Sequence, residues 1–401
     1  MSSNLSDYPD KFGGDFSSLW KLDVMPPIHR LSWWWYWVII FIPDPNNPKR
    51  SRQLMTLWST KETEAIRVSG YWWKPGSRMY KDENEGFVIP GMVCAWWYDG
   101  ENMFEPMTMK ECRMGVFPDT HPLYPGEGTG EGAGAIVPLN REDMSFGMRP
   151  GNSSFWLRVS SDQESRTKGA PSIFEAELTP WWGPPSSLTY KNNILLANGM
   201  GYDILRLQGT LCKIKVDDEE FHGSAYFQKV TVQSPAFPWF WGMLHFNDGS
   251  YIDWFMPHVS PLSTTMDDIP WKRRDFIRSP NIGSGIFHDK KLDRTENFEK
   301  CEVELTESDE GLRDEMGNLL PKFRVRIWNP QTKISIAVKA VSRARWTFDQ
   351  PTRGGMVSHL TYNEYPFEVE GIRIEDDTGV RNLEDYEWIH GNAEHAWGIL
   401  H

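Results

Sequence analysis

A histidine, a tyrosine and an aspartate lie close together in the aromatic segment of residues 239–255, WFWGMLHFNDGSYIDWF. The Asn-Asp-Gly sequence at 247–249 is typical of a hairpin turn, so the segment is expected to form two paired strands. His245, Tyr251 and Asp253 would then approach one another in apolar surroundings. Because burial shifts pKa values and can make a side chain a proton donor, we expect general acid chemistry from these three residues. The alternative is a hydrogen-bonded core histidine beside a surface aspartate.

The first of these two strands has two different faces. Side chains alternate along a strand, so one face combines Trp239, Trp241, Met243 and His245. The opposite face carries an ordinary core set: Phe240, Gly242, Leu244 and Phe246. The first face is expected to bind a flat, apolar molecule next to the titratable groups.

Several other chemistries lack their sequence patterns. The chain has no HExxH, GxSxG or EF-hand motif, its ten histidines are scattered, and its four cysteines include no CxxC pair. The glycine-rich segment at 121–135 lacks the Lys-Ser/Thr of a phosphate-binding loop, and we interpret it as a flexible flap. We therefore expect no metal, no cofactor and no disulfide.

The overall charge and the N-terminal sequence indicate which classes of binding partner are expected. The 401 residues carry a formal net charge of −13 with no block of lysines or arginines, which disfavours nucleic acid and an anionic membrane surface. The longest apolar run, Trp33 to Ile42, has ten residues, about half of a membrane span. The first residues resemble no targeting signal, so cytoplasmic residence is expected. The remaining partner class is a hydrophobic small molecule.

The elements that must position these residues are mostly strands. The chain contains 21 Trp, 21 Phe and 13 Tyr, and short apolar runs recur between turn residues. This pattern predicts an all-β fold with few short helices, the best helix candidate being Ser59 to Val68. The segment 29–42, HRLSWWWYWVIIFI, is apolar on both faces, which predicts a strand between a cavity and a second layer. Near the C-terminus, Glu394 and His395 are expected in a strand that closes a second domain rather than in a catalytic site.

Two motifs resemble those of the lipocalin-type superfamily that includes carotenoid 1,2-hydratase and AttH-like proteins. An early family strand reads roughly Glu-Trp-Trp-Tyr, which matches residues 33–36 except that Trp33 replaces the glutamate. A later family strand reads Gly-x-Ala-Trp/Tyr, which matches Gly223, Ala225 and Tyr226. The resemblance covers residues 29–255 and identifies the chain as a divergent member. It implies two tandem β-barrel or sandwich domains, which we place at residues 1–258 and 259–401, with the polar segment 260–293 as the candidate link.

This chain departs from the family motif at the positions of the aspartate and histidine that could protonate a substrate. Where the family has Asp-His-x-Trp-Gly, this chain has Gln-Lys-Val-Thr-Val at 228–232. We expect Trp34, Tyr36, Tyr226 and Gln228 to bind an apolar ligand, with the last two orienting a substrate. An acid for hydratase chemistry would then have to come from His245, Tyr251 or Asp253.

The resulting functional hypothesis is an enzyme acting on a terpenoid or polyene. It would promote hydration, isomerisation or cyclisation of a carbon–carbon double bond in an aromatic pocket. Two alternatives stay open: a pericyclase that shapes its substrate without an acid, and a non-catalytic carrier of an apolar ligand.

Overall fold

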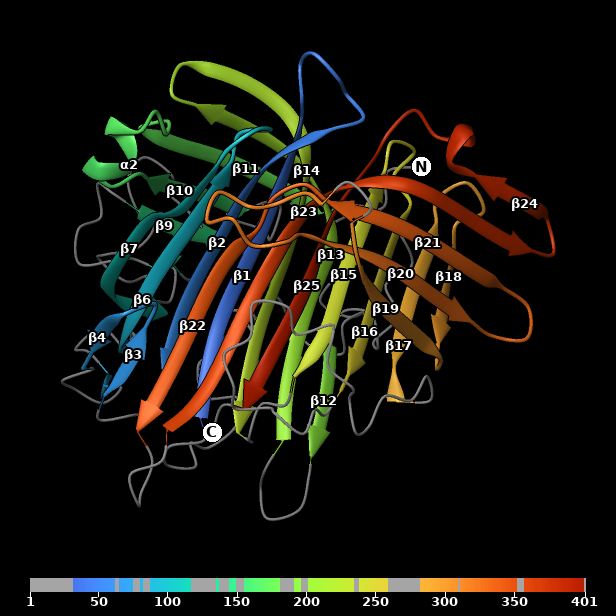
Figure 1. The fold of residues 1–401 in the computed structure, drawn as a ribbon. Coiled ribbons are helices and arrows are strands. Elements are labelled where there is room, and N and C mark those ends of the chain that lie inside the picture. The colour runs from blue at the N-terminus through green and yellow to red at the C-terminus, as the bar shows by residue number, and fades with distance from the viewer. Residues whose placement is uncertain are drawn as a thin grey trace.

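Two curled antiparallel sheets form the described part of the protein, in agreement with the all-β prediction (Figure 1). The computed structural model describes residues 32–61, 65–74, 80–81, 87–116, 135–136, 144–148, 155–180, 191–195, 201–233, 238–258, 282–308, 311–351 and 357–399. In this part of the chain the helices are the short α2 (Gln163–Thr167) and the 3-10 turn η7 (Leu383–Asp385). The predicted fold class is therefore confirmed.

The first sheet has twelve strands and contains most of the N-terminal half. In chain order they are β1 (Ser32–Pro43), β2 (Ser51–Lys61), β5 (Tyr80–Lys81), β6 (Phe87–Tyr98), β7 (Met103–Val116), β8 (Ala135–Ile136), β9 (Met144–Met148), β10 (Phe155–Ser160), β11 (Ile173–Pro180), β12 (Lys191–Leu195), β13 (Gly201–Val216) and β14 (Glu219–Gln233). The spatial order is β5-β6-β2-β1-β14-β13-β11-β10-β9-β8, with β7 beside β6 and β12 beside β13. The long β1 thus lies near the middle of its sheet.

The second sheet has thirteen strands and draws two of them from the N-terminal half. Its members are β3 (Ile66–Val68), β4 (Tyr71–Trp73), β15 (Trp239–Phe246), β16 (Tyr251–Pro257), β17 (Ser284–Asp289), β18 (Arg294–Phe298), β19 (Cys301–Glu307), β20 (Pro321–Trp328), β21 (Lys333–Ala340), β22 (Ala344–Pro351), β23 (Val357–Asp376), β24 (Gly379–Asn382) and β25 (Ile389–Ile399). The order is β18-β17-β16-β15-β25-β23-β21-β20-β19, with β22 and β24 on β23 and β3 on β22. The strands β15 and β16 precede the domain boundary that we placed after residue 258, and they pair within this second sheet.

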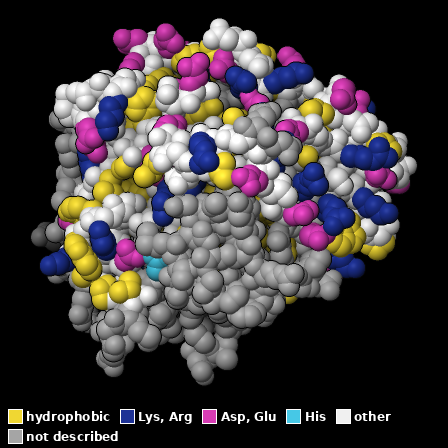
Figure 2. Space-filling model, in the orientation of Figure 1, with side chains coloured by type: hydrophobic (Ala, Val, Ile, Leu, Met, Phe, Trp, Pro, Cys, Tyr) yellow, Lys and Arg dark blue, Asp and Glu magenta, His cyan; other side chains and the backbone are white. Residues whose placement is uncertain are grey.

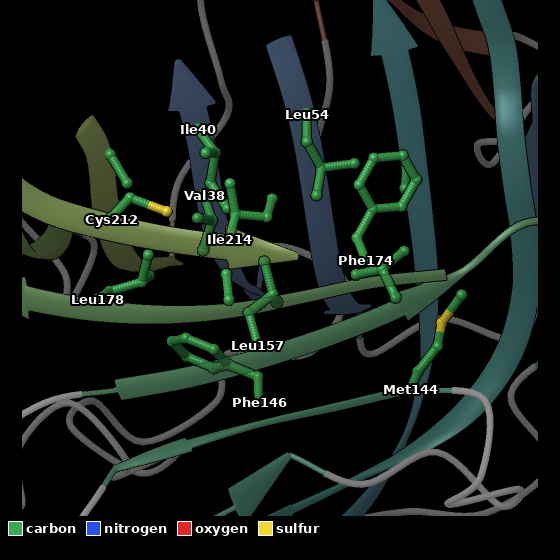
Figure 3. Packing of buried hydrophobic residues seen from close by; sticks show 14 of the residues in the cluster. Val38, Ile40, Leu54, Met144, Phe146, Leu157, Phe174, Leu178, Cys212 and Ile214 are labelled. Atoms are coloured by element: carbon green, nitrogen blue, oxygen red, sulfur yellow. The ribbon is translucent and has the colours of Figure 1, made fainter. Parts of the chain in front are cut away.

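The strand β1 buries both of its faces, as its double apolar pattern predicts. Tyr36, Val38, Ile40 and Ile42 pack into the core of the first sheet. Figure 3 shows Val38 and Ile40 in this core beside residues of neighbouring strands. Trp37, Ile39 and Phe41 point the other way, into a core shared with the second sheet. One strand therefore serves two hydrophobic layers.

This shared core, which we call the inter-sheet layer, consists mainly of large aromatic side chains. From the first sheet it takes Trp37, Trp96 and Tyr226 among others, and from the second sheet Trp241, Trp346 and Leu360 among others. The ring centroids of Trp96 and Trp346 are 4.8 Å apart in an edge-on arrangement. Aromatic pairs of this kind contribute roughly 0.5–1.5 kcal/mol beyond the area that they bury. The second sheet has a further core of its own on its opposite face.

Some sequence expectations differ from the structure or lie outside its described part. The predicted helix at Ser59–Val68 is wrong, because β2 continues to Lys61 and residues 66–68 form β3. Pairing with β1 and burial of nearly every β2 side chain outweigh the weak helical pattern. The flap at 121–135 lies almost entirely outside the described residues, and so does the candidate link up to residue 281, whereas residues 284–298 form β17 and β18.

The described surface mixes both signs of charge. On the face in Figure 2, acidic and basic side chains are interspersed. Neither helix of the described chain is long and apolar enough to cross a membrane.

Candidate functional site

The predicted hairpin at residues 239–257 forms and presents one face to the first sheet. β15 and β16 pair in antiparallel register, and Gly249 in the turn adopts a φ of 88°. Trp241 and Met243 lie in the inter-sheet layer, and Trp239 packs against it. Phe240, Leu244 and Phe246 lie in the separate core of the second sheet, as the alternation predicts.

His245 is fully buried at this face, with both ring nitrogens engaged. Its Nδ1 lies 2.8 Å from the Ser224 hydroxyl, and its Nε2 lies 2.6 Å from the backbone oxygen of Gln208. Burial lowers the pKa of His245 to about 3. A neutral imidazole at ordinary pH is a poor source of protons, and one bonded at both ring nitrogens corresponds to the core histidine that the sequence left as the alternative to an acid.

Asp253 and Tyr251 share a face of β16 but have different neighbours. Asp253 is buried, accepts a 3.1 Å hydrogen bond from the Gln208 side chain, and lies 4.0 Å from the Arg206 guanidinium. Burial raises the pKa of Asp253, whereas Arg206 and Gln208 act in the opposite direction. Tyr251 stacks on His288, with ring centroids 5.3 Å apart. The register thus places His245 opposite Tyr251, while their side-chain contacts lead to other residues.

The predicted ligand-binding residues divide between two layers. Tyr226 lies in the inter-sheet layer, with its ring 5.1 Å from that of Trp241 and its hydroxyl donating to the Gln228 side chain at 2.8 Å. Tyr36 points into the core of the first sheet, away from this face, because it alternates with Trp37 along β1. The side chain of Trp34 lies outside the described residues.

The structure adds a pair of buried carboxyl groups that sequence reasoning missed. Glu364 on β23 lies directly opposite Glu394 on β25, and their exposed fractions are 1% and 2%. The indole nitrogen of Trp239 donates a hydrogen bond to a carboxylate oxygen of Glu394. The Tyr362 ring lies 6.1 Å from the rings of both Trp37 and Trp239. We call Glu364 and Glu394 the carboxyl pair.

Burial and mutual repulsion make the carboxyl pair retain protons. Burial and the neighbouring Glu394 carboxyl raise the pKa of Glu364 well above its ordinary value. Burial also raises the pKa of Glu394 to about 7, although hydrogen bonds with Glu364, Tyr362 and the Trp239 indole act to lower it, as does the charge of Arg206. Tyr362 acts to lower the pKa of Glu364, but burial outweighs it, because an ionised carboxylate here would lack the solvation of water. Two like charges this close do not ionise together, and the pair therefore holds a proton near neutral pH.

The carboxyl pair and Asp253 belong to one electrostatic neighbourhood. Burial raises the pKa of Tyr226, and Asp253, Glu394 and Glu364 raise it further, while Arg206 lowers it. Buried carboxyl groups are thus combined with the aromatic rings of the inter-sheet layer.

A weak signal for the carboxyl pair exists in the sequence. In residues 389–399, IHGNAEHAWGI, Glu394 is the one acid of a strand-length run that also contains alanine, isoleucine and tryptophan. A buried acid in a strand needs a partner or a proton, which marks it for attention. The identity of the partner depends on strand pairing, which no local pattern of β25 contains.

Metal ligation is not supported by the described residues. No three histidine, cysteine, aspartate or glutamate side chains of the described ranges are grouped as a metal ion requires. All four cysteines are buried free thiols.

Comparisons with known proteins concern the fold. No protein-family model matches the chain, and no curated protein matches its sequence. Among solved structures, the chain is similar to a putative AttH from Nitrosomonas europaea, with a TM-score of 0.44 and 9% identity, over 91% of this chain and 92% of that one. It is also similar to kievitone hydratase from Nectria haematococca, with a TM-score of 0.36 and 10% identity, over 94% of each chain.

Proposed function

We propose that the protein is an enzyme that protonates a carbon–carbon double bond of a terpenoid or polyene. The outcome would be hydration, isomerisation or cyclisation of the bound molecule. The observation that carries this proposal is the carboxyl pair, buried beside the aromatic inter-sheet layer. An apolar molecule lying against those rings would meet a proton donor at its edge.

Glu394 is the proton donor in this proposal. A pKa of about 7 lets the group carry a proton and also give it up near neutral pH, which suits a general acid. Once Glu394 has lost its proton, the Trp239 indole and the charge of Arg206 stabilise the carboxylate. Glu364, with the higher pKa, keeps its own proton and avoids a second negative charge.

The aromatic residues have a separate role. Protonation of a double bond creates a carbocation, and aromatic faces attract cations by roughly 0.5–2 kcal/mol per ring. Trp239 donates to Glu394, and Tyr362 hydrogen-bonds with the carboxyl pair. Trp241 lies opposite Glu394 in the strand register, and its ring is 5.1 Å from that of Tyr226. Asp253 remains a proposed second acid, and Gln228 a proposed orienting group through its bond to Tyr226.

The test measures whether deuterium from heavy water is transferred to carbon in the product. Solvent extraction of the purified protein first identifies any co-purifying apolar molecule. That molecule and a panel of polyenes are then incubated with the protein in D2O. Mass spectrometry should detect carbon-bound deuterium in the product. Glu394→Gln should slow this incorporation at least ~100-fold, the lower range for loss of a general acid. Glu375→Gln, an exposed glutamate on the same strand as Glu364, is the matched control and should leave it unchanged.

The two alternatives give different outcomes in the same experiment. A pericyclase would form a product isomer without deuterium, and Glu394→Gln would turn over normally. A carrier would return its ligand unaltered. Either result would overturn the proposal.

A further inference from the structure

A chain of hydrogen bonds lies on the opposite face of β23 from the carboxyl pair. Nδ1 of His359 lies 2.5 Å from the Asp349 carboxylate, and Nε2 of His359 lies 2.8 Å from the Thr361 hydroxyl. Asp349 on β22 is directly opposite His359 in the strand register. Because Leu360 packs in the inter-sheet layer, the alternation directs His359 and Thr361 away from it.

The order of atoms is that of a nucleophile, a base and an orienting acid. The Asp349 carboxylate accepts from Nδ1 and thereby fixes the tautomer in which Nε2 carries a lone pair. That lone pair faces the Thr361 hydroxyl, which donates to it. A hydroxyl, a histidine and a carboxylate connected through these two nitrogens are the elements of an activated acyl-transfer nucleophile.

The burial of His359 and Thr361 restricts the size of a molecule that could react with the Thr361 hydroxyl. The exposed fraction is 4% for His359 and 1% for Thr361, whereas the Asp349 side chain is partly exposed. Trp397 lies directly opposite Thr361, and its ring is 5.8 Å from that of His359. Burial of this degree excludes bulky acyl donors, so the substrate class that we consider is a small ester.

We propose that Thr361 is the nucleophile of a second reactive site that takes an acyl group from a small ester. The Thr361 oxygen attacks the ester carbonyl carbon while its proton passes to Nε2 of His359, and Asp349 stabilises the resulting imidazolium. The tetrahedral intermediate then breaks its bond to the alkoxide, which leaves with the proton from His359. Water attacks the acyl-threonine with His359 again as base, releasing the carboxylic acid and restoring the hydroxyl. This proposal uses none of the residues of the proposed double-bond chemistry.

The test uses p-nitrophenyl acetate with the full chain. Peptide mass spectrometry should find one acetyl group on Thr361, together with release of p-nitrophenol. Thr361→Val, which replaces the hydroxyl by a methyl of similar shape, should abolish the adduct, and Thr361→Ser should retain it. His359→Gln should slow acetylation at least ~100-fold, the scale for loss of a general base. Thr347→Val, directly opposite Thr361 on β22, is the matched control and should acetylate normally.

The structural alternative makes a different prediction. If the hydrogen-bond chain only stabilises the strands, Thr361→Val will lower the melting temperature, and p-nitrophenol release will match that of the parent chain. Acetyl groups confined to lysines would likewise overturn the proposal. Should His359→Gln fail to fold, the pair Thr361→Val and Thr361→Ser decides the matter.

Discussion

Glu364 and Glu394 lie directly opposite each other on β23 and β25, each almost completely buried. A buried carboxyl pair is costly to build, because each ionised group lacks water and each repels the other. It is the feature on which the proposed proton chemistry rests.

The rate of double-bond protonation should depend on pH through the carboxyl pair. Because Glu394 donates only when protonated and its pKa is about 7, turnover should be highest below pH 7 and fall as the pH rises through it. The measurement is initial rate against pH between 5.5 and 8.5, with Glu375→Gln as control. A flat profile would contradict the assignment and favour a pericyclase.

Glu394→Gln should also change how stability depends on pH. The pKa of Glu394 in the folded chain is above its ordinary 4.5, so its stabilising contribution is present below 4.5 and is lost as the pH rises through 7. Relative to the parent chain, Glu394→Gln should therefore have a higher free energy of unfolding at pH 8 than at pH 5. The difference between the two pH values should be about 1–3 kcal/mol, from the size of the pKa shift. Urea unfolding at the two pH values measures the difference, and equal effects at both would refute the raised pKa.

His245 should stay neutral over the physiological range. Its pKa in the folded chain is about 3, below the ordinary 6.5, so its contribution to stability is present above 6.5 and is lost as the pH falls toward 3. Nitrogen-15 NMR of the imidazole should show the neutral form from pH 8 to pH 5. An imidazolium signal at pH 6 would restore His245 as a candidate acid.

Close packing between β15 and β25 should make Gly242 intolerant of a side chain. A Cβ at this position would lie 2.2 Å from the Trp254 ring and 2.9 Å from the backbone oxygen of Asn392. Gly242→Ala should destabilise the fold by roughly 1–3 kcal/mol, the usual cost of overpacking. Gly371→Ala, where a Cβ would meet nothing within 4 Å, is the matched control. Thermal unfolding of both variants checks this, and equal melting temperatures would contradict the close packing.

The alternation of side chains made much of the local structure predictable. The double apolar face of β1, the two faces of β15 and the turn near Gly249 all follow from residue order over a few positions. The helix expected at Ser59–Val68 failed because its periodicity was weak and pairing with β1 decided the conformation.

The sequence by itself determined that this chain is built from strands and which side chains share a face, because a strand repeats every two residues. Only the tertiary structure decided which faces meet. It turned Tyr36 away from Tyr226, gave His245 two hydrogen-bond partners from the first sheet, and brought Glu364 opposite Glu394. The reason is that strand register and sheet packing are set by the burial of the whole chain, so the pKa values that follow from burial are fixed at that level too.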